Sequence, residues 1–351
     1  MDKPLSLYLD LIRFFAAVAV LLAHASVSIL DGHWLQPIKF AGHDAVIVFF
    51  VLSGFVISYV SSEKESEITT FIISRISRLY SVIIPAIILT LILDGIGKQL
   101  DLSLYEDISY SQYFFTIFSN FFLINELQFN SVQLFSNEPF WSLGYEYWYY
   151  IIFAAYYFFQ GTKRWFLLTI LFATVGIKVL IMMPIWWAGV YVFYLSKNYR
   201  LPKFSGWILF IGSIIGYVLL KYYHITGILY EYTQHHLDEY LYNHLKWSRG
   251  FLGDYFIALF VSMNFLGVSI LARGKSISFA LGTRLIRYFA SHTFALYLFH
   301  APMLKFYFSL THNNYLTILM TLVTVLSIGK IVEQQKYTIK AVLLNLQGKY
   351  L

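Results

Sequence analysis

The sequence predicts an all-α, polytopic membrane protein with about ten transmembrane helices in one bundle and both termini in the cytoplasm. Its 351 residues are 58% hydrophobic, 20% aromatic and only 13% charged, and the mean hydropathy is +0.63. A soluble domain usually carries about 25% charged residues, so this composition excludes an ordinary soluble enzyme. It is also the opposite of a disordered composition. At about 20 residues for each span plus short loops, the length suits roughly ten helices.

Ten apolar stretches, taken in chain order, are the expected spans. They cover residues 4–30, 43–60, 79–96, 140–160, 165–182, 183–197, 204–220, 251–271, 289–308 and 314–331. Residues 183–197 are short for a hydrocarbon core about 30 Å thick, and the apolar stretch 112–126 could span in their place. We expect 183–197 to cross the membrane and 112–126 to be partly buried or re-entrant in an outer loop. Residues 1–335 would then form a transmembrane domain, followed by a short cytoplasmic tail, 336–351.

The basic residues give the orientation, because cytoplasmic loops are enriched in lysine and arginine. With the N-terminus inside, 17 of the 25 basic residues fall on the cytoplasmic side, five fall outside and three fall within spans. The 17 are Lys3, Lys64, Arg75, Arg78, Lys163, Arg164, Lys197, Arg200, Lys203, Arg273, Lys275, Arg284, Arg287, Lys330, Lys336, Lys340 and Lys349. Choosing 112–126 as a span would move only Lys163 and Arg164. The net charge of +6 therefore indicates contact with the lipid bilayer, and no nucleic-acid partner is expected.

The first span carries three ionisable residues, Asp10, Arg13 and His24, and such residues within a membrane span are usually functional. Asp10 and Arg13 are neighbours on a helix because they are three positions apart. His24 follows Arg13 by eleven positions, which is three turns plus about 20° at about 100° per residue. The three side chains therefore share one face. The plain alternative is an ion pair at the helix end and a packed core histidine.

Two arginines, Arg75 and Arg78, share a helix face beside the membrane on the cytoplasmic side. A guanidinium group binds phosphate oxygens through two parallel hydrogen bonds, so the pair could hold a phosphate-bearing ligand. It could equally be an ordinary positive anchor. In the preceding span, the small residues Ser53 and Gly54 favour close packing of helices over a functional site.

A further acid, Glu146, closes the aromatic stretch FWSLGYE at 140–146. An interfacial aromatic belt explains Trp141 but not the acid, for which we expect a histidine partner. His300 lies within the ninth span, in YLFHAP at 297–302, and core packing explains it equally well. Pro302 has no N–H and would leave a backbone carbonyl of that helix without its donor.

Other kinds of site find little support. The chain has no cysteine, which excludes disulfides, a thiolate nucleophile and cysteine-based metal sites. Phosphate-loop, nucleophile-elbow and zinc-protease motifs are absent, and His235 and His236 are more simply solvated than metal-binding. We expect no metal and no permanently bound cofactor.

Taken in order, five motifs resemble the acyltransferase 3 family of bacterial membrane O-acyltransferases that act on carbohydrates. They are LDLIRFFAAVAVLLAH at 9–24, FFVLSGF at 49–55, RISR at 75–78, FWSLGYE at 140–146 and YLFHAP at 297–302. The resemblance covers the chain from about residue 5 to 335, and only a short tail follows, as expected of the stand-alone form without a soluble C-terminal domain. It implies a ten-helix core in the bacterial inner membrane.

The resemblance also implies the reaction. The donor would be cytoplasmic acyl-CoA, with acetyl-CoA expected, and the acceptor a hydroxyl of a cell-envelope carbohydrate or glycolipid. It assigns catalysis to His24 with support from Arg13, donor binding to Arg75 and Arg78, and a site role to Glu146. The secondary candidates are Asp10, Trp141, Ser142, Tyr297 and His300.

A histidine can serve as the base that acyl transfer to a hydroxyl needs, so we expect His24 to deprotonate the acceptor. An acyl-His24 intermediate is the mechanistic alternative. The alternative function is a polysaccharide or glycolipid exporter without acyl-transfer activity, in which Arg13, His24 and Glu146 line a translocation path.

Overall fold

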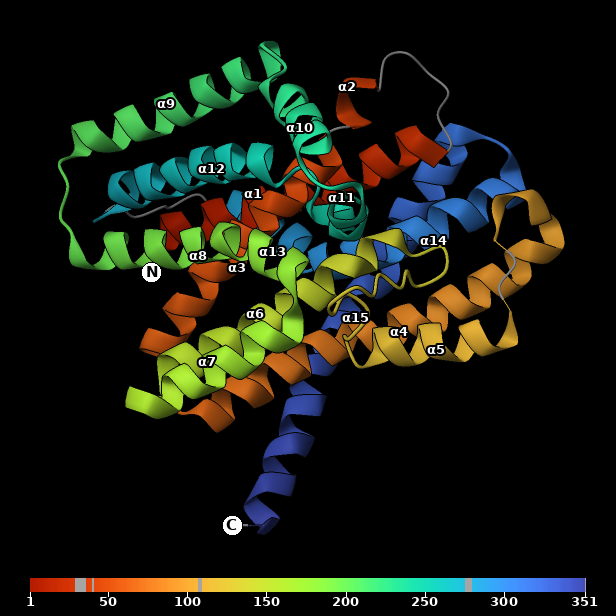
Figure 1. Ribbon diagram of the computed structural model, residues 1–351, viewed down its shortest axis with the longest axis horizontal. Helices are drawn as coiled ribbons and strands as arrows, with labels where there is room; N and C mark the ends of the chain where they lie inside the picture. Colours follow the sequence, from red (N-terminus) through yellow and green to blue (C-terminus); the bar gives the residue numbers. More distant parts are fainter. Residues whose placement is uncertain (29–35, 40, 107–108, 275–279, 351) are drawn as a thin grey trace.

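The computed structural model describes residues 1–28, 36–39, 41–106, 109–274 and 280–350, and these residues form helices joined by short connections, with no named strand among them (Figure 1). The helices are α1 Lys3–Ser28, α2 Gln36–Lys39, α3 Ala41–Glu63, α4 Ile68–Leu100, α5 Tyr110–Phe121, α6 Trp141–Phe158, α7 Gly161–Val175, α8 Ile177–Asn198, α9 Lys203–Tyr222, α10 Ile225–His236, α11 Glu239–Leu245, α12 Phe251–Ala272, α13 Ala280–Ala290, α14 Thr293–Thr311 and α15 Asn314–Tyr350. Three 3₁₀ turns add η2 Leu102–Leu104, η3 Glu138–Phe140 and η4 Lys246–Ser248. The predicted end of the first span at residue 30, together with Lys275 and Leu351, lies outside the described residues.

The prediction of an all-α fold is confirmed for the described residues, and their helices suit a multi-pass membrane protein. Within the described ranges, seven helical segments are long and apolar enough to cross a membrane. They are α1, α3, α4, α8, α9, α15 and the run from Glu239 to Ala272 that ends in α12. Three further predicted spans overlap the helices α6, α7 and α14, which are not among the seven. The count of about ten spans and the cytoplasmic termini stay predictions.

One predicted boundary, between 165–182 and 183–197, is wrong. The helix instead breaks at Gly176, whose φ of +81° lies in the left-handed region that favours glycine. A Cβ atom there would also lie 2.7 Å from the Cα atom of Gln128. As a result α8 has 22 residues and α7 has 15, and α7 is only about 22 Å long. The segment that we doubted therefore belongs to a full-length helix, and the 12-residue α5 does not reach across a bilayer.

The helices α1, α3 and α14 form the centre of the bundle. The α1 helix packs against both α3 and α14, while α3 also packs along α8 and α14 along α4 and α15. The predicted close packing at Ser53-Gly54 is confirmed, because a Cβ atom on Gly54 would lie 2.0 Å from the carbonyl oxygen of Trp186 in α8. The small side chain of Gly54 thus lets two helix backbones approach, as in other membrane helix pairs.

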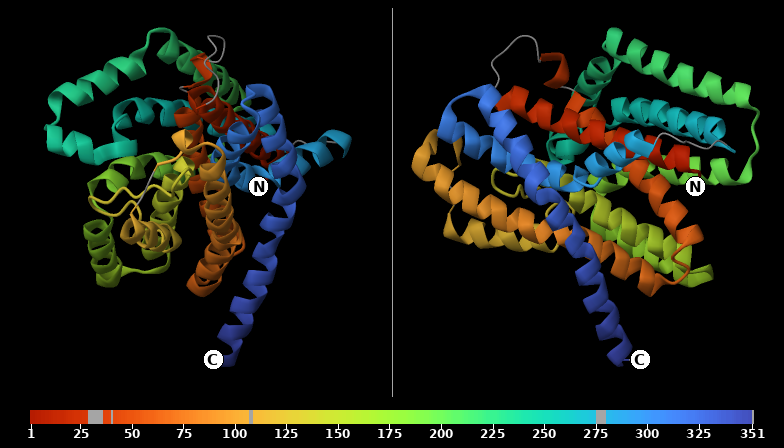
Figure 2. Two further views of the ribbon diagram at one scale, coloured as in Figure 1. Left: turned by 90° about the vertical axis from the view of Figure 1, so that its right-hand side faces the viewer. Right: turned by 180° about the vertical axis from the view of Figure 1, so that it is seen from behind.

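The last helix, α15, is continuous from Asn314 to Tyr350. It has no break between residues 335 and 336, where we placed the boundary between the domain and its tail. It packs against α14 and α4, and its C-terminal end projects away from the other helices (Figure 2).

Candidate active site

Three cavities follow one another through the centre of the bundle. We call them the basic cavity, of about 400 Å³, the central cavity, of about 60 Å³, and the histidine cavity, of about 180 Å³. The basic and central cavities share walls at Arg13, Arg78, Thr293 and Phe294. The central and histidine cavities share walls at Val46 and Tyr297, so the central cavity lies between the other two.

The side chains of α1 follow this row, as their shared helix face predicts. Asp10 and Arg13 line the basic cavity, Arg13 also reaches the central cavity, and His24 lines the histidine cavity. The expected pair of Asp10 and Arg13 is present, with 3.6 Å between Oδ1 and Nη1. Asp10 also pairs with Arg287 of α13.

The basic cavity carries four cationic side chains from four helices, namely Arg13, Arg78, Arg287 and Lys336. Its acids are already engaged: Asp10 by the arginines, and Glu333 by the start of α14. The Oε1 atom of Glu333 accepts hydrogen bonds from the backbone N–H groups of Phe294 at 2.9 Å and Ala295 at 3.0 Å, which favours a negative charge at that helix N-terminus. The cavity therefore presents cationic groups suited to an anion.

The structure separates the two arginines that we expected to act together. Arg78 lines the basic and central cavities, whereas Arg75 lines none of the three. The Nη2 atom of Arg75 instead donates to both carboxylate oxygens of Glu65, at 2.9 and 2.8 Å, and its guanidinium group lies over the ring of Phe71. Glu65 lies in the turn between α3 and α4, and its carboxylate holds the Arg75 side chain at this turn. Of the two arginines, Arg78 alone lines the row of cavities.

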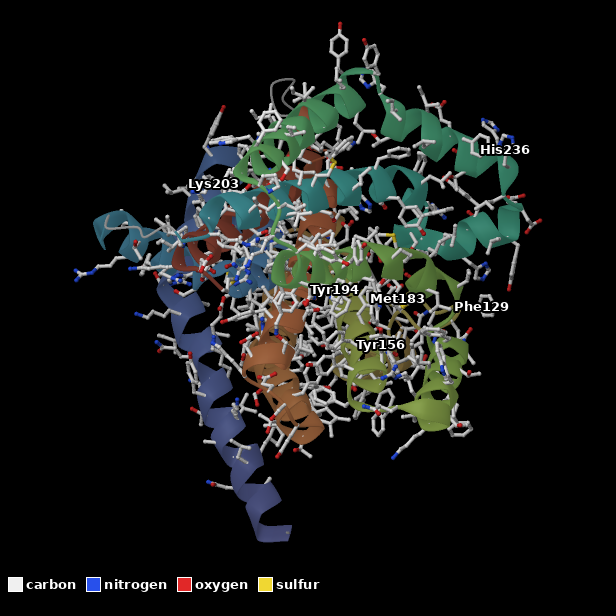
Figure 3. The ribbon with its side chains drawn as sticks, turned by 90° about the vertical axis from the view of Figure 1, so that its left-hand side faces the viewer. Phe129, Tyr156, Met183, Tyr194, Lys203 and His236 are labelled. Carbon is white, nitrogen blue, oxygen red and sulfur yellow. The ribbon has the colours of Figure 1, made fainter. Side chains whose placement is uncertain are left out.

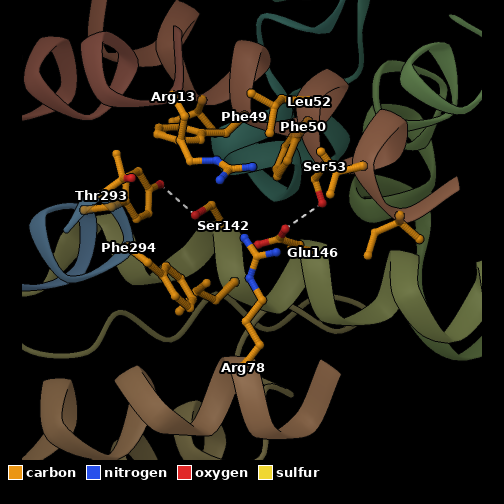
Figure 4. A pocket seen from close by; sticks show the side chains of 15 residues that line it. Arg13, Phe49, Phe50, Leu52, Ser53, Arg78, Ser142, Glu146, Thr293 and Phe294 are labelled. Carbon is orange, nitrogen blue, oxygen red and sulfur yellow. Dashed lines mark hydrogen bonds between the residues drawn. The ribbon is translucent and has the colours of Figure 1, made fainter. Parts of the chain in front are cut away.

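Glu146 lines the central cavity. The prediction that it pairs with a histidine is wrong. Its Oε1 atom accepts a hydrogen bond from Ser53 Oγ at 2.6 Å and another from the Tyr150 hydroxyl, one turn further along α6. Figure 4 shows the guanidinium group of Arg78 turned toward this carboxylate. The histidines lie further along the row of cavities. The partners of Glu146 are instead the hydroxyl groups of Ser53 and Tyr150 and the neighbouring cation of Arg78. We assigned Ser53 to packing alone, although a polar side chain within a span was a signal for this contact.

His24 lines the histidine cavity with its side chain 24% exposed. Its Nδ1 atom lies 2.9 Å from the backbone carbonyl oxygen of Val20. That contact places a ring hydrogen on Nδ1, which leaves the lone pair of the neutral ring on Nε2. The Nε2 atom lies 4.0 Å from Oε2 of Glu138 in η3, so the basic nitrogen of the ring faces the cavity side of η3.

His300 lies behind His24. The two rings meet edge to face with 4.9 Å between their centroids. His300 is fully buried, and its Nδ1 atom lies 2.9 Å from the carbonyl oxygen of Leu296. Its Nε2 atom has no hydrogen-bond partner within the described part of the chain. This residue touches the candidate base and does not itself line the cavities.

Pro302 frees a carbonyl, as expected. The carbonyl oxygen of Leu298, four residues earlier, lacks its helical donor and accepts a hydrogen bond of 2.8 Å from Nδ2 of Asn137 instead. Asn137 is fully buried, and the sequence analysis did not identify it as a candidate. It ties the loop before α6 to α14, and thereby positions η3 beside the histidine cavity.

The remaining secondary candidates form walls of the row. The hydroxyl of Tyr297 lies 2.6 Å from Ser142 Oγ, with Ser142 in the wall of the central cavity. Trp141 lies in the wall of the histidine cavity and stacks on Trp247, with 5.2 Å between ring centroids and 5° between ring planes. Of these three residues, only Tyr297 lines both the central cavity and the histidine cavity.

Two further ionisable residues at this level escaped the sequence analysis. His43 lines the histidine cavity, and its Nε2 atom lies 3.0 Å from each carboxylate oxygen of Asp254. Both residues fall within predicted spans, so the criterion that we applied to Asp10, Arg13 and His24 would have found them.

His235 and His236 are exposed, in keeping with the solvated interpretation. Figure 3 shows His236 at the edge of the molecule. Among the residues that the structure describes, no group of three His, Cys, Asp or Glu side chains could hold a metal ion.

The acyltransferase domain family, acyltransferase 3, matches this chain over residues 6–329, a range that includes every residue lining the row except Lys336 and Tyr337 of the basic cavity and Glu333 beside them. No curated protein and no solved structure matches the chain.

Proposed function

Since this chain belongs to the acyltransferase 3 family, we propose that it is a membrane O-acyltransferase. It moves an acyl group, with acetyl expected, from cytoplasmic acyl-CoA to a hydroxyl of a cell-envelope carbohydrate or glycolipid in a bacterial inner membrane. The observation that carries this proposal is the row of three cavities, which leads from a cationic cavity to a histidine with adjoining walls throughout.

The basic cavity suits the donor. Acyl-CoA carries a diphosphate and a 3′-phosphate, and arginine and lysine bind such groups through charge-assisted hydrogen bonds. Arg78, Arg287 and Lys336 come from three different helices and surround about 400 Å³. In our proposal the central cavity, of about 60 Å³, widens to admit the narrow, extended pantetheine arm, which passes Arg13 and Glu146 and brings the thioester toward His24.

The histidine cavity suits the acceptor. In the proposed reaction, Nε2 of His24 takes the proton of the acceptor hydroxyl while the oxygen attacks the thioester carbonyl carbon. The carbon–sulfur bond then breaks, and the CoA thiolate leaves and takes a proton from the imidazolium ring, which regenerates His24. The hydroxyl group of Tyr297, which lines both cavities and lies beside Ser142 Oγ, is the proposed donor for the oxyanion that forms in this step.

An acyl-His24 intermediate remains the mechanistic alternative, in which the acyl group rests on Nε2 before the acceptor attacks. Single-turnover labelling separates the two routes. Labelled acetyl-CoA without acceptor leaves label on the protein in the two-step route, and leaves none at saturating donor in the direct route.

The exporter alternative is disfavoured by the size of the central cavity. Its volume of about 60 Å³ has room for a few water molecules, and a sugar ring could not pass without separation of α1, α3, α6 and α14. Acyl transfer needs the central cavity to widen only enough for the extended pantetheine arm, because the sugar stays in the histidine cavity and does not pass through.

The test is comparative mass spectrometry of envelope glycans from cells with and without this gene. We expect a mass gain that matches an ester, and its loss in a His24→Ala variant. A His236→Ala variant is the matched control, because this exposed histidine lies at the edge of the molecule. Glycan export that stops in the absence of the protein, with no acyl group ever found, would reject the enzyme.

A further inference from the structure

A second histidine faces the same cavity as the candidate base. His43 belongs to the first turn of α3 and lines the histidine cavity together with His24. Its Nε2 atom lies 3.0 Å from both oxygens of Asp254 in α12. The carboxylate is almost fully buried, with its side chain 5% exposed. A buried carboxylate that holds one nitrogen of an imidazole ring fixes both the orientation of the ring and the position of its hydrogen.

This contact decides which atom of His43 is available to a ligand. Because Asp254 accepts at Nε2, the hydrogen of the neutral ring lies on Nε2 and its lone pair on Nδ1. Asp254 is not among the residues that line the cavity, whereas His43 is. The ring therefore lies between the carboxylate and the cavity, and it offers the cavity a hydrogen-bond acceptor.

Close packing of two helices brings the two histidines to one cavity. A Cβ atom on Gly42 would lie 2.6 Å from Cβ of Ala23, so α1 and α3 approach closely at the residues next to His24 and His43. Trp141 and Trp247, stacked on each other, line the same cavity. Their flat apolar surfaces can pack against the C–H face of a sugar ring.

We propose that His43 binds a second hydroxyl of the acceptor, next to the one that reacts at His24. This inference rests on the proposed function. It narrows the acceptor to a sugar unit with hydroxyl groups on adjacent or nearby carbons, one donating to Nε2 of His24 and the other to Nδ1 of His43. Asp254 acts as a positioning residue, because it contacts only His43 of the two histidines.

The competing interpretation is that His43 and Asp254 only tie α3 to α12. Two substitutions separate the interpretations. In His43→Gln the side-chain amide reaches the position of Nε2 and keeps a donor for Asp254, but nothing remains at the position of Nδ1. In His43→Asn the amide takes the position of Nδ1 and loses Asp254, so this change is combined with Asp254→Asn to leave no buried charge without a partner.

The neighbouring residue provides a matched control. Asp44 ties α3 to α9 through Lys221 at 2.6 Å and the Tyr217 hydroxyl at 2.7 Å, and it does not line the histidine cavity. Asp44→Asn therefore disturbs the same end of α3 without touching the proposed contact.

The experiment measures the ester content of envelope glycans in cells that produce equal amounts of each full-length variant, and acetyl-CoA affinity on the purified proteins. We expect His43→Gln to lower the ester content at least about tenfold, the double asparagine variant to recover part of it, and acetyl-CoA affinity to stay unchanged throughout. Asp44→Asn keeps the ester. If His43→Gln keeps the ester and the double variant loses it, or if acetyl-CoA affinity falls with the ester, the inference is rejected. If the native protein forms no ester, the proposed function itself fails before any variant is compared.

Discussion

The imidazole ring of His24 rests edge to face on that of His300, with 4.9 Å between the ring centroids. The second ring is fully buried, and its Nε2 atom has no partner within the described residues. The contact restricts His24 from behind, while the Val20 carbonyl holds its Nδ1 atom. Orientation of the candidate base therefore depends on packing as well as on hydrogen bonding.

His300→Ala should consequently lower both stability and activity. It removes a buried ring at the cost of about 2–4 kcal/mol and gives His24 room to rotate. His300→Phe should restore most of both, because it keeps a ring at that place and removes an unpaired polar atom. Thermal unfolding in detergent and acyl transfer check this. A His300→Ala protein of native stability without activity would instead indicate a chemical role for the imidazole.

The two arginines of RISR should respond differently to substitution. Arg78→Ala should weaken acetyl-CoA binding at least about tenfold, as expected for the loss of a charge-assisted hydrogen bond to phosphate. It should lower the unfolding temperature less than Arg75→Ala does, because Glu146 keeps its two hydroxyl donors and a second cation, Arg13, in the cavity. Isothermal titration with acetyl-CoA measures the affinity. Equal affinity of Arg78→Ala and native protein would remove this residue from the donor site.

Arg75→Ala should show the reverse pattern. It leaves the nearly buried carboxylate of Glu65 without its partner, and breaking a buried ion pair from one side costs about 3–5 kcal/mol. Replacing both residues, as in Arg75→Met with Glu65→Gln, should recover most of that loss. Thermal unfolding and acetyl-CoA titration on the same samples check this, and a selective loss of affinity in Arg75→Ala would return it to the donor site.

The charge of Glu146 can be tested apart from its hydrogen bonds. In Glu146→Gln the amide oxygen still accepts from Ser53 and Tyr150, while the negative charge beside Arg78 disappears. We expect the fold to persist and acyl transfer to fall, because two cations of the central cavity lose their counter-charge. Ser53→Ala is the control: it keeps the charge and removes one hydrogen bond, worth about 1 kcal/mol. A larger loss of transfer in Ser53→Ala than in Glu146→Gln would contradict this.

The contact between Asn137 and the Leu298 carbonyl can be tested by a double-mutant cycle. Asn137→Ala should destabilise the protein by about 1–3 kcal/mol, because a buried carbonyl loses its donor. Pro302→Ala supplies a backbone N–H to the same carbonyl, so the cost of Asn137→Ala should shrink in its presence. Unfolding of the four proteins gives the coupling energy. Strictly additive costs would show that the two donors do not compete for that oxygen.

The directions of side chains along one helix were predictable from the sequence. Asp10, Arg13 and His24 follow the row of cavities because the period of a single helix fixes their relative directions. Contacts between helices were not predictable in the same way. Asp254 lies 211 residues from His43 in the chain, and no local pattern links them.

The ion pair of Arg75 with Glu65 is a second contact that the sequence did not predict. The sequence shows that Arg75 and Arg78 share a helix face. It does not show that Arg75 pairs with Glu65, because that contact depends on the position of the turn between α3 and α4. The break at Gly176 was missed for a related reason. The apolar character of the chain continues on both sides of it, whereas the positive φ and the close approach of Gln128 depend on a distant loop.

The narrow middle of the row has a kinetic consequence. Donor and acceptor would enter from opposite ends, so neither would block the mouth used by the other. Free CoA should then inhibit competitively with respect to acyl-CoA and non-competitively with respect to the sugar, and initial rates should give intersecting reciprocal plots.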